Sequence, residues 1–356
     1  MKDHLLVTLA DRGFLRQAKQ LFSSVYWNAG WHGDYMLLAH EIPEDEQQWF
    51  KDRGILIRNT PPDFVVNPTA GPLSYSATVT AKLFLFSIEF KRWDAVVFVD
   101  ADCIVRSSLD ALTRTHRFAA ARDWLGTATL ESQTLKPDRM SPSEYQKAFR
   151  GYSLTATTFN TGVFAFNTAI LTPDRLTELA TIASKYQPFA RFSEQLWMNL
   201  HFYRNWERLP PRYNLFASYL CARRRLRAED IDATILHFPR FGCESGYRCW
   251  EKENPFYNEW KGNLDRAELI DIKRLRPPAR RRPRAQRRLA TFLHIRLALQ
   301  KDYLNFVRNK LSLRTRLRRL RKIMGRTLRF AQAGLAFGPP SHVARRRRRA
   351  RCAQQR

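Results

Sequence analysis

The 356-residue sequence lacks several features that would define its class at once. It has no apolar run of the roughly 18 residues that a membrane-spanning helix needs. Its five cysteines are odd in number and form no C-x-x-C pair, so we expect reduced thiols and no disulfide framework. Cys243 and Cys249 lie near His237, but without paired spacing a zinc site is not expected. No signal peptide opens the chain, since strand-like residues begin at Leu5, and we therefore expect a cytoplasmic protein.

Acidic residues are almost missing from the last quarter of the chain. Residues 271–356 contain 28 Lys or Arg but only two acids, so they carry +26 of the total net charge of +28. Residues 1–270 are nearly neutral, with a net charge of +2. A basic protein whose charge is spread evenly would point to nucleic acid, whereas this distribution predicts a domain over residues 1–270 and an Arg-rich tail over residues 271–356.

The tail changes character along its length. Prolines and arginines at residues 277–284 predict a linker, and residues 344–356 read as a disordered polycation. Residues 289–330 place apolar side chains at helical spacing among many arginines, as in a helix that lies in a membrane interface. We expect an anionic membrane surface as the partner, on the cytoplasmic face. Nucleic acid is the alternative partner, because aromatics such as Tyr303 and Phe306 could stack on bases.

The region before the tail alternates strand and helix patterns. Strands are expected at residues 5–7, 35–39, 55–57, 96–99 and 159–166, and helices at residues 15–27, 44–52 and 80–90. A polar loop is expected from Gln133 to Tyr145, and a later helix with Thr172 as its N-cap. From Leu5 to about Val105, the β–α succession predicts a parallel sheet with helices on both faces.

Two carboxylates follow the apolar run Val96–Val99, in Asp100-Ala101-Asp102. Because side chains alternate along a strand, both carboxylates are expected on the same side, at the sheet edge where open α/β sheets bind ligands. Neighbouring carboxylates repel, and a divalent cation that also binds phosphate oxygens removes this conflict. The alternative is that one Asp caps the next helix and the other is solvated, which is common for a bare D-x-D.

Six further blocks, in a fixed order, decide between these alternatives. They are Leu5–Asp11 with Phe14, Thr80–Leu83, Asn160–Phe164, Ser193–Asn199, Leu209–Asn214 and Ile235–Phe238. Through these blocks, roughly residues 4–262 resemble the retaining glycosyltransferases of family eight, which include glycogenin, bacterial lipopolysaccharide glucosyl- and galactosyltransferases, and galactinol synthases. The resemblance implies a GT-A fold, which is a Rossmann-like mixed sheet with helices on both faces.

The resemblance also implies a reaction. A hexosyl group would move from a UDP-sugar donor to a glycan or glycolipid acceptor, in envelope polysaccharide or lipopolysaccharide synthesis. Self-glycosylation, as in glycogenin, is an alternative. The implied cofactor is Mn²⁺ or Mg²⁺, bound by Asp100, Asp102 and His237. An imidazole ligand suits Mn²⁺ better than the harder Mg²⁺. The sequence does not define the sugar, the acceptor or the oligomeric state.

The donor contacts are likewise carried over from the family. Leu9, Asp11 and Phe14 stand where the family holds uracil and ribose, with Phe14 in place of a frequent tyrosine. Lys82 stands where the family has a Lys or Arg near the donor; a solvated helix lysine is the alternative.

The family's cationic residue at the diphosphate has a less clear counterpart in this sequence. The family usually has Lys-Pro-Trp shortly after its histidine, and here Arg248-Cys249-Trp250 follows at a longer interval. The planar guanidinium of Arg248 suits phosphate, and Arg240 is a competing candidate.

Three residues are expected at the transferred sugar. Asn160, in Asn160-Thr161-Gly162, offers an amide that both donates to and accepts from hydroxyls. Glu194 and Gln195 stand where the family usually has Asp-Gln. None of them is an obvious nucleophile for double displacement, so the resemblance implies front-face transfer with retention.

Overall fold

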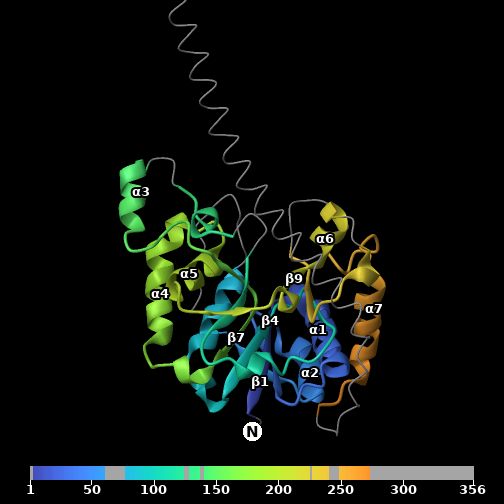
Figure 1. The fold of residues 1–356 in the computed structure, drawn as a ribbon. Helices are drawn as coiled ribbons and strands as arrows, with labels where there is room; N and C mark the ends of the chain where they lie inside the picture. Colours follow the sequence, from blue (N-terminus) through green and yellow to red (C-terminus); the bar gives the residue numbers. More distant parts are fainter. Residues whose placement is uncertain are drawn as a thin grey trace, which may run out of the picture. The chain divides into compact units, whose positions relative to one another are not determined.

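The computed structural model describes residues 3–60, 77–123, 128–136, 140–224, 227–239 and 248–272 (Figure 1). Arg240, Cys243 and the tail from residue 273 onward therefore lie outside the described residues, and so do the predictions of a linker and a membrane-interface helix. Within the described ranges, no helix is both long enough and apolar enough to cross a bilayer.

The described part contains ten strands, seven α-helices and several short 3₁₀ helices. The strands are β1 (His4–Ala10), β2 (Asp34–Ala39), β3 (Leu56–Asn59), β4 (Ala95–Val99), β5 (Cys103–Val105), β6 (Ala119–Arg122), β7 (Phe159–Asn167), β8 (Glu207–Leu209), β9 (Leu215–Phe216) and β10 (Ile235–His237). The α-helices are α1 (Leu15–Asn28), α2 (Glu44–Asp52), α3 (Pro142–Ala148), α4 (Arg175–Tyr186), α5 (Ser193–His201), α6 (Ala217–Arg224) and α7 (Tyr257–Asp265).

The strands form a large sheet and a small one. The large sheet has the order β3-β2-β1-β4-β7-β6-β8, and the small sheet has the order β5-β10-β9. β3, β2, β1 and β4 run parallel, whereas β7 is antiparallel to both of its neighbours. The sheet is therefore mixed, as the family resemblance implied. The parallel arrangement expected from the strand–helix succession is confirmed for β1 to β4, and β7 is antiparallel because it returns beside β4 without a parallel crossover.

Both faces of the large sheet are buried. Along β1, Leu5, Val7 and Leu9 belong to one apolar cluster, and Leu6 and Ala10 belong to the other. The two clusters alternate because successive strand side chains point to opposite faces. α4 and α5 cover the first face and α1 and α2 cover the second (Figure 1). The result is the layered α/β architecture expected for a GT-A fold.

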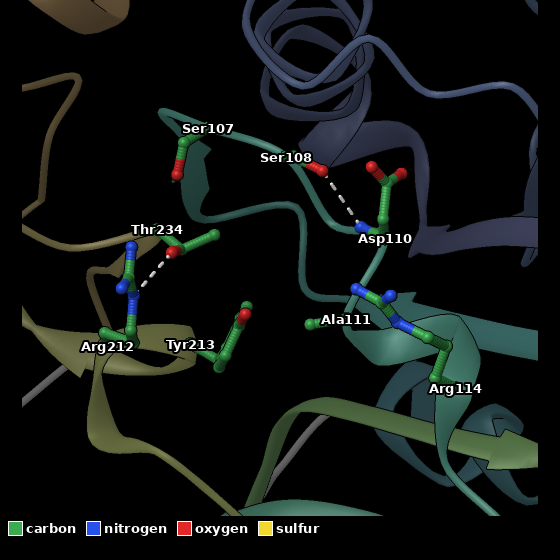
Figure 2. A pocket seen from close by; sticks show the side chains of 8 residues that line it. All are labelled: Ser107, Ser108, Asp110, Ala111, Arg114, Arg212, Tyr213 and Thr234. Atoms are coloured by element: carbon green, nitrogen blue, oxygen red, sulfur yellow. Dashed lines mark hydrogen bonds between the residues drawn. The ribbon is translucent and has the colours of Figure 1, made fainter. Parts of the chain in front are cut away.

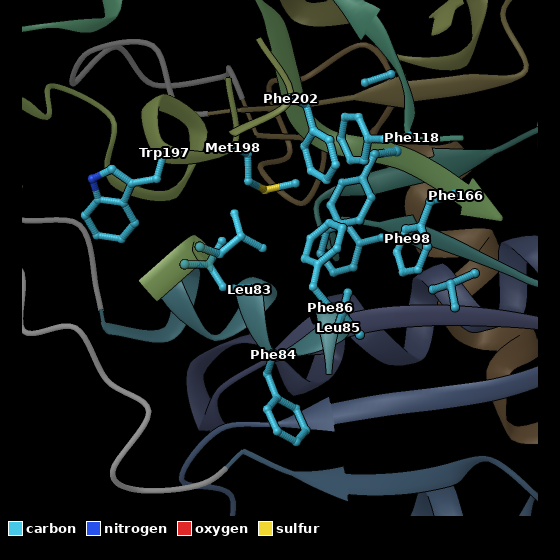
Figure 3. Close-up of a cluster of buried hydrophobic side chains, with 14 of the residues drawn as sticks. Leu83, Phe84, Leu85, Phe86, Phe98, Phe118, Phe166, Trp197, Met198 and Phe202 are labelled. Carbon is cyan, nitrogen blue, oxygen red and sulfur yellow. The ribbon is translucent and has the colours of Figure 1, made fainter. Parts of the chain in front are cut away.

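Phenylalanines dominate the first of these faces (Figure 3). The rings of Phe118 and Phe202 stack with centroids 4.2 Å apart, and those of Phe86 and Phe166 stack at 5.0 Å. Each fully buried ring contributes roughly 2–3 kcal/mol of hydrophobic stabilisation. The cluster anchors the segments that carry Lys82 and Glu194, because Phe86 lies on the same 3₁₀ segment as Lys82 and residues of α5 pack beside it. The apolar cluster thus fixes the backbone positions of Lys82 and Glu194.

Three local expectations need correction. Residues 80–90 form no α-helix but two 3₁₀ segments, Ala77–Phe86 and Ile88–Arg92, separated by Ser87 in an extended conformation. The first segment opens with β-branched residues and is buried on almost every side, which disfavours a regular amphipathic helix. Helix α4 begins at Arg175, three residues after the expected cap Thr172. The expected loop ends in α3, whose start is capped by Ser141 through a capping box.

Candidate functional site

The D-x-D pair lies in a turn that joins the two sheets. β4 ends at Val99, and the Asp100 N–H donates to the Gly162 carbonyl of β7 at 2.8 Å. The Cys103 N–H then donates back to the Asp100 carbonyl at 3.1 Å, and β5 begins there in the small sheet. The two carboxylates are brought together by this tight turn and not by the strand alternation that the sequence suggested. They occupy the carboxyl end of β4, as expected.

Lys82, Asp100 and Glu194 form a buried charged cluster. The Lys82 Nζ lies 2.9 Å from Asp100 Oδ1 and 3.5 Å from Glu194 Oε1, and the Lys82 side chain is only 4% exposed. Glu194 is held by a second contact, a hydrogen bond from the Thr161 hydroxyl at 3.2 Å. Lys82 is therefore not the solvated helix lysine of the alternative interpretation. A buried ammonium between two carboxylates is a fixed electrostatic element.

The surroundings shift the pKa values of this cluster in different directions. Burial raises the pKa of Asp100 to about 6, although the nearby Lys82 acts in the opposite sense. Burial alone would lower the pKa of Lys82, but the carboxylates of Asp100 and Glu194 outweigh it and raise that pKa. Burial also acts to raise the pKa of Asp102, yet the adjacent His237 outweighs it and lowers that pKa. The two carboxyls of the D-x-D are thus not equivalent.

His237 ends β10 and faces the D-x-D. Its Nε2 lies 3.2 Å from Asp102 Oδ1 and 4.0 Å from Asp100 Oδ2. Asp102 Oδ1 is buried and accepts no hydrogen bond in the described structure. The three side chains that the family resemblance assigned to a metal therefore do converge, although they come from two segments more than 130 residues apart in the sequence.

A chain of hydrogen-bonded amides, the amide relay, backs this site. Its direction is set by obligatory backbone donors: the Gly162 N–H donates to Asn160 Oδ1 at 2.9 Å, and the Thr161 N–H donates to Gln195 Oε1 at 3.2 Å. The Asn160 amide nitrogen must then donate to Gln195 Oε1, at 2.9 Å, and Gln195 Nε2 must donate to the Asp123 carboxylate, at 3.0 Å. Each amide is thereby held in one orientation.

Asn214 extends the chain of hydrogen bonds to His237 and sets the direction of the last one. Asn214 Nδ2 donates to Asn160 Oδ1 at 2.8 Å, which leaves Asn214 Oδ1 as the acceptor for His237 Nδ1 at 2.7 Å. The Nδ1 proton is fixed in this way, and the Nε2 lone pair of the neutral ring is directed toward Asp102. A lone pair that faces a carboxylate oxygen at 3.2 Å is repelled unless a positive charge lies between them, either a metal ion or a proton on Nε2. The donor set therefore fits a metal ion.

Gly162 is required at its position for a steric reason. A Cβ at residue 162 would lie 2.2 Å from His237 Cε1, far inside any allowed contact. The absence of a side chain at Gly162 lets the imidazole ring of His237 approach the backbone closely. Any side chain here would displace His237 from Asp102.

Cys103 lies within the same group of possible ligand atoms as Asp102 and His237, and the sequence analysis did not consider it. Its side chain belongs to the apolar cluster under the sheet, and burial raises the pKa of its thiol well above the ordinary value. A protonated thiol is a poor ligand, and hard cations prefer oxygen and nitrogen. Asp100, Asp102 and His237 are therefore the more suitable set.

The sequence matches the profile of glycosyl transferase family 8 over residues 6–252. The chain belongs to glycosyl transferase family 8. This finding confirms the resemblance and the expected class of enzyme, a glycosyltransferase.

Curated relatives and solved structures agree with this placement. Galactinol synthase 5 and galactinol synthase 3 of Arabidopsis thaliana are 24% and 23% identical to the chain over 237 and 243 residues. Each match covers 64% of this chain and 66% of the relative, just under two thirds of its length. The galactosyltransferase LgtC, solved with donor and acceptor sugar analogs, superposes with a TM-score of 0.55 at 17% identity, covering 73% of this chain and 95% of LgtC. The bifunctional glycosyltransferase WbbM gives a TM-score of 0.56 at 17% identity, covering 76% of this chain and 52% of WbbM. These structures confirm the GT-A fold.

The three residues that the resemblance assigns to the nucleotide lie near the end of β1 in this family 8 chain. Leu9 is buried in the core, so only its backbone is available for a ligand. Asp11 is held by a hydrogen bond from the Thr78 hydroxyl at 3.0 Å. The half-buried Phe14 meets Trp250 edge to face, with ring centroids 6.0 Å apart.

Arg248 lies beside Trp250 and makes no described contact with the charged cluster. Its guanidinium lies 5.4 Å from the centroid of the Trp250 ring, and none of the described contacts joins it to the D-x-D. The next residue, Cys249, is nevertheless close to that turn: burial raises the pKa of its thiol, and the charge of Asp102 adds to the effect. Arg248 is thus held beside the site, while Arg240 lies outside the described residues.

Sequence reasoning missed two members of the relay. Asn214 ends one of the six family 8 blocks, so its position there was a usable signal, although its partner was not readable. Asp123 lies in none of the blocks, and it follows β6 with no neighbouring motif. Only the fold brings it to Gln195.

Proposed function

We propose that the protein is a metal-dependent, retaining glycosyltransferase that moves a hexosyl group from a UDP-sugar to a glycan or glycolipid acceptor. One observation carries the metal dependence: the relay aims the Nε2 lone pair of His237 at Asp102 Oδ1, which accepts no described hydrogen bond. Asp100, Asp102 and His237 would hold Mn²⁺, or Mg²⁺. Bound there, the ion would neutralise the charge that develops on the departing diphosphate.

The chain's own residues have separate tasks in this proposal. Lys82 holds Asp100 and Glu194 in fixed positions and adds positive charge close to the leaving group. Asn160 and Gln195 each keep one amide hydrogen for a sugar hydroxyl, because both lone pairs of each amide oxygen already accept hydrogen bonds within the relay. Phe14 and Trp250 form an aromatic wall for the base, and Arg248 supplies a cation next to it.

The stereochemistry follows from what the site offers. Glu194 is paired with Lys82 and accepts a hydrogen bond from Thr161, and such a stabilised carboxylate is a weak nucleophile. We therefore favour front-face transfer over double displacement. The bond between the anomeric carbon and the phosphate oxygen breaks, the acceptor oxygen bonds to the same face of that carbon, and the acceptor proton moves to the departing phosphate.

A panel of UDP-sugars tests this proposal. The full-length protein is mixed with each sugar and Mn²⁺, and UDP release is measured with and without EDTA. We expect one preferred donor and a loss of release with EDTA. Metal-independent release, or no release from any UDP-sugar of the panel, would contradict the proposal.

For the acceptor we propose a lipid-linked glycan that the enzyme meets at a membrane surface. The support is the charge distribution: residues 271–356 carry a net charge of +26, and each basic residue near an anionic leaflet contributes roughly 1 kcal/mol. The place of action would be the cytoplasmic face, in envelope polysaccharide or lipopolysaccharide synthesis.

A chain that ends at residue 275 separates the tail from the catalytic part. It keeps the described contacts of residues 266–272, including the hydrogen bond from the Tyr26 hydroxyl to the Asp271 carbonyl. We expect it to hydrolyse its UDP-sugar normally and to lose sedimentation with vesicles that contain anionic lipid. Equal sedimentation of both chains would contradict membrane docking by the tail, and a selective loss of DNA binding would favour the nucleic-acid alternative.

A further inference from the structure

A second polar cavity lies at the other end of the small sheet. Its volume is about 180 Å³, and it is lined by Ser107, Ser108, Asp110, Ala111, Arg114, Arg212, Tyr213 and Thr234 (Figure 2). Thr234 directly precedes β10, whereas His237 ends that strand. With a rise of about 3.3 Å per residue, Thr234 and His237 are about 10 Å apart along this strand. The cavity shares no lining residue with the candidate metal ligands or the charged cluster.

The lining has a net positive charge and many hydroxyls. Two guanidiniums, Arg114 and Arg212, outnumber the single carboxylate of Asp110. In Figure 2, Arg212 and Thr234 line one side of the cavity, while Asp110 and Arg114 line the opposite side. Arg212 is preorganised, because its Nε donates to the Thr234 hydroxyl at 2.9 Å. The exposed Arg114 makes no side-chain hydrogen bond to any described residue, so its guanidinium is available to a ligand.

We propose that this cavity binds a small phosphorylated sugar. Two guanidiniums on facing walls are suited to one phosphate, since each can form charge-assisted, bidentate hydrogen bonds to it. The carboxylate of Asp110 and the hydroxyls of Ser107 and Ser108 match the hydroxyls of a sugar, and the Tyr213 ring supplies an apolar surface. The volume is smaller than the roughly 300–1,000 Å³ of sites for drug-sized ligands, which limits the ligand to about one monosaccharide.

Three chain segments connect this cavity with the candidate metal site. Asp102 leads through β5 to Ser107, Tyr213 directly precedes Asn214, and Thr234 leads through β10 to His237. The cavity thus borders the residues that orient His237 without sharing any of them. A ligand there would be non-competitive with the nucleotide donor.

Titration calorimetry with the full-length protein tests the proposal, with glucose 6-phosphate as the probe and glucose and inorganic phosphate as the two partial probes. We expect binding of glucose 6-phosphate, weaker binding of phosphate and none of glucose. Arg114→Gln should weaken glucose 6-phosphate binding about 10- to 150-fold, since a hydrogen bond to a charged group contributes about 1.5–3 kcal/mol. Arg150→Gln is the matched control, because Arg150 is equally exposed, makes no side-chain contact within the described residues and lies outside the cavity.

Two further measurements distinguish this site from the donor site. Saturating UDP with Mn²⁺ should leave glucose 6-phosphate binding unchanged, whereas loss of binding would show that the probe occupies the donor site and would overturn the proposal. Asp110→Asn should strengthen the binding of inorganic phosphate and narrow its difference from glucose 6-phosphate. Absence of binding, or equal effects of the Arg114 and Arg150 variants, would also overturn it. The titrations of the Arg114, Arg150 and Asp110 variants depend neither on metal binding nor on transfer activity.

Discussion

The two sides of the candidate active site hold their side chains in position by different interactions. On one side, the charged cluster of Lys82, Asp100 and Glu194 is held by ion pairs. On the other side, the amide relay from Asp123 to His237 is held by hydrogen bonds between amides, with a carboxylate at one end, and backbone N–H groups set their direction. Ion pairs fix charge but leave some freedom of geometry, whereas the relay fixes the position of a single proton.

The D-x-D lies between these two sides, and its carboxyls differ accordingly. Asp100 pairs with Lys82, and burial raises its pKa, whereas the pKa of Asp102 next to His237 is lowered. Residues two positions apart in the sequence can thus be assigned different tasks. Asp100 couples the site to the charged cluster, and Asp102 couples it to the relay.

Substitution of Asp102 by Asn should have the largest effect, because it removes the negative charge that faces His237. We expect Asp102→Asn to reduce UDP release by about 10³-fold or more, as for the loss of a principal electrostatic contact. The fold should survive, since Asp102 Oδ1 accepts no described hydrogen bond and an amide has the same shape. Circular dichroism and the unfolding midpoint serve as controls, and activity near that of the parent with Mn²⁺ would refute the metal assignment.

Glu194 tests the charged cluster alone. If Glu194 acts on the sugar, Glu194→Gln should lower kcat by about 10²-fold while the Kd for UDP changes little, because the nucleotide binds elsewhere. Turnover with the preferred donor and UDP titration calorimetry give the two values. Equal losses in both would mean that Glu194 only holds Lys82 in place.

Asn214 tests the amide relay alone. Asn214→Leu removes the acceptor for His237 Nδ1, and we expect Mn²⁺ affinity to fall about 10- to 100-fold, as for other groups that orient a ligating histidine. Asn214→Asp keeps that acceptor but loses the bond to Asn160, so metal affinity should be retained while the unfolding midpoint falls. Calorimetric Mn²⁺ titrations of both variants and the parent measure these affinities. Similar affinities for the Leu variant and the parent would show that the relay does not orient His237.

The smallest expected effect is a pH dependence that belongs to the charged cluster. Because the pKa of Asp100 is raised to about 6 in the folded protein, the native state binds this proton more tightly than the unfolded chain between about pH 4 and 6. Asp100 should therefore lower stability as the pH rises through this window, by at most about 1.4 kcal/mol per pH unit.

Denaturant unfolding in EDTA, compared between the parent and Asp100→Asn, measures this slope. The variant should lack the Asp100 contribution and show a flatter profile between pH 4 and 6. Parallel profiles would mean that Asp100 titrates normally in the folded protein.

Much of this site could be predicted from the sequence because its blocks are local. The strand before the D-x-D, the end of β10 at His237 and the helix over residues 44–52 follow from apolar patterns a few residues long. Asp100, Asp102 and His237 were grouped only by family resemblance, and the fold does bring them together. The 3₁₀ segments around Lys82 were not predictable, because tertiary burial on all sides overrides helical propensity there.

The sequence by itself determined the chemistry that is available: the carboxylates, the imidazole, the amides and the separation of a nearly neutral domain from a basic tail. These are properties of residue type and order. Only the tertiary structure decided that Lys82 is a buried partner of two carboxylates, that Asp123 reaches Gln195, and that Gly162 lies against His237. The physical reason is that hydrogen-bond direction, burial and pKa depend on which side chains share a volume, and here those neighbours are between 18 and 112 residues apart in the chain.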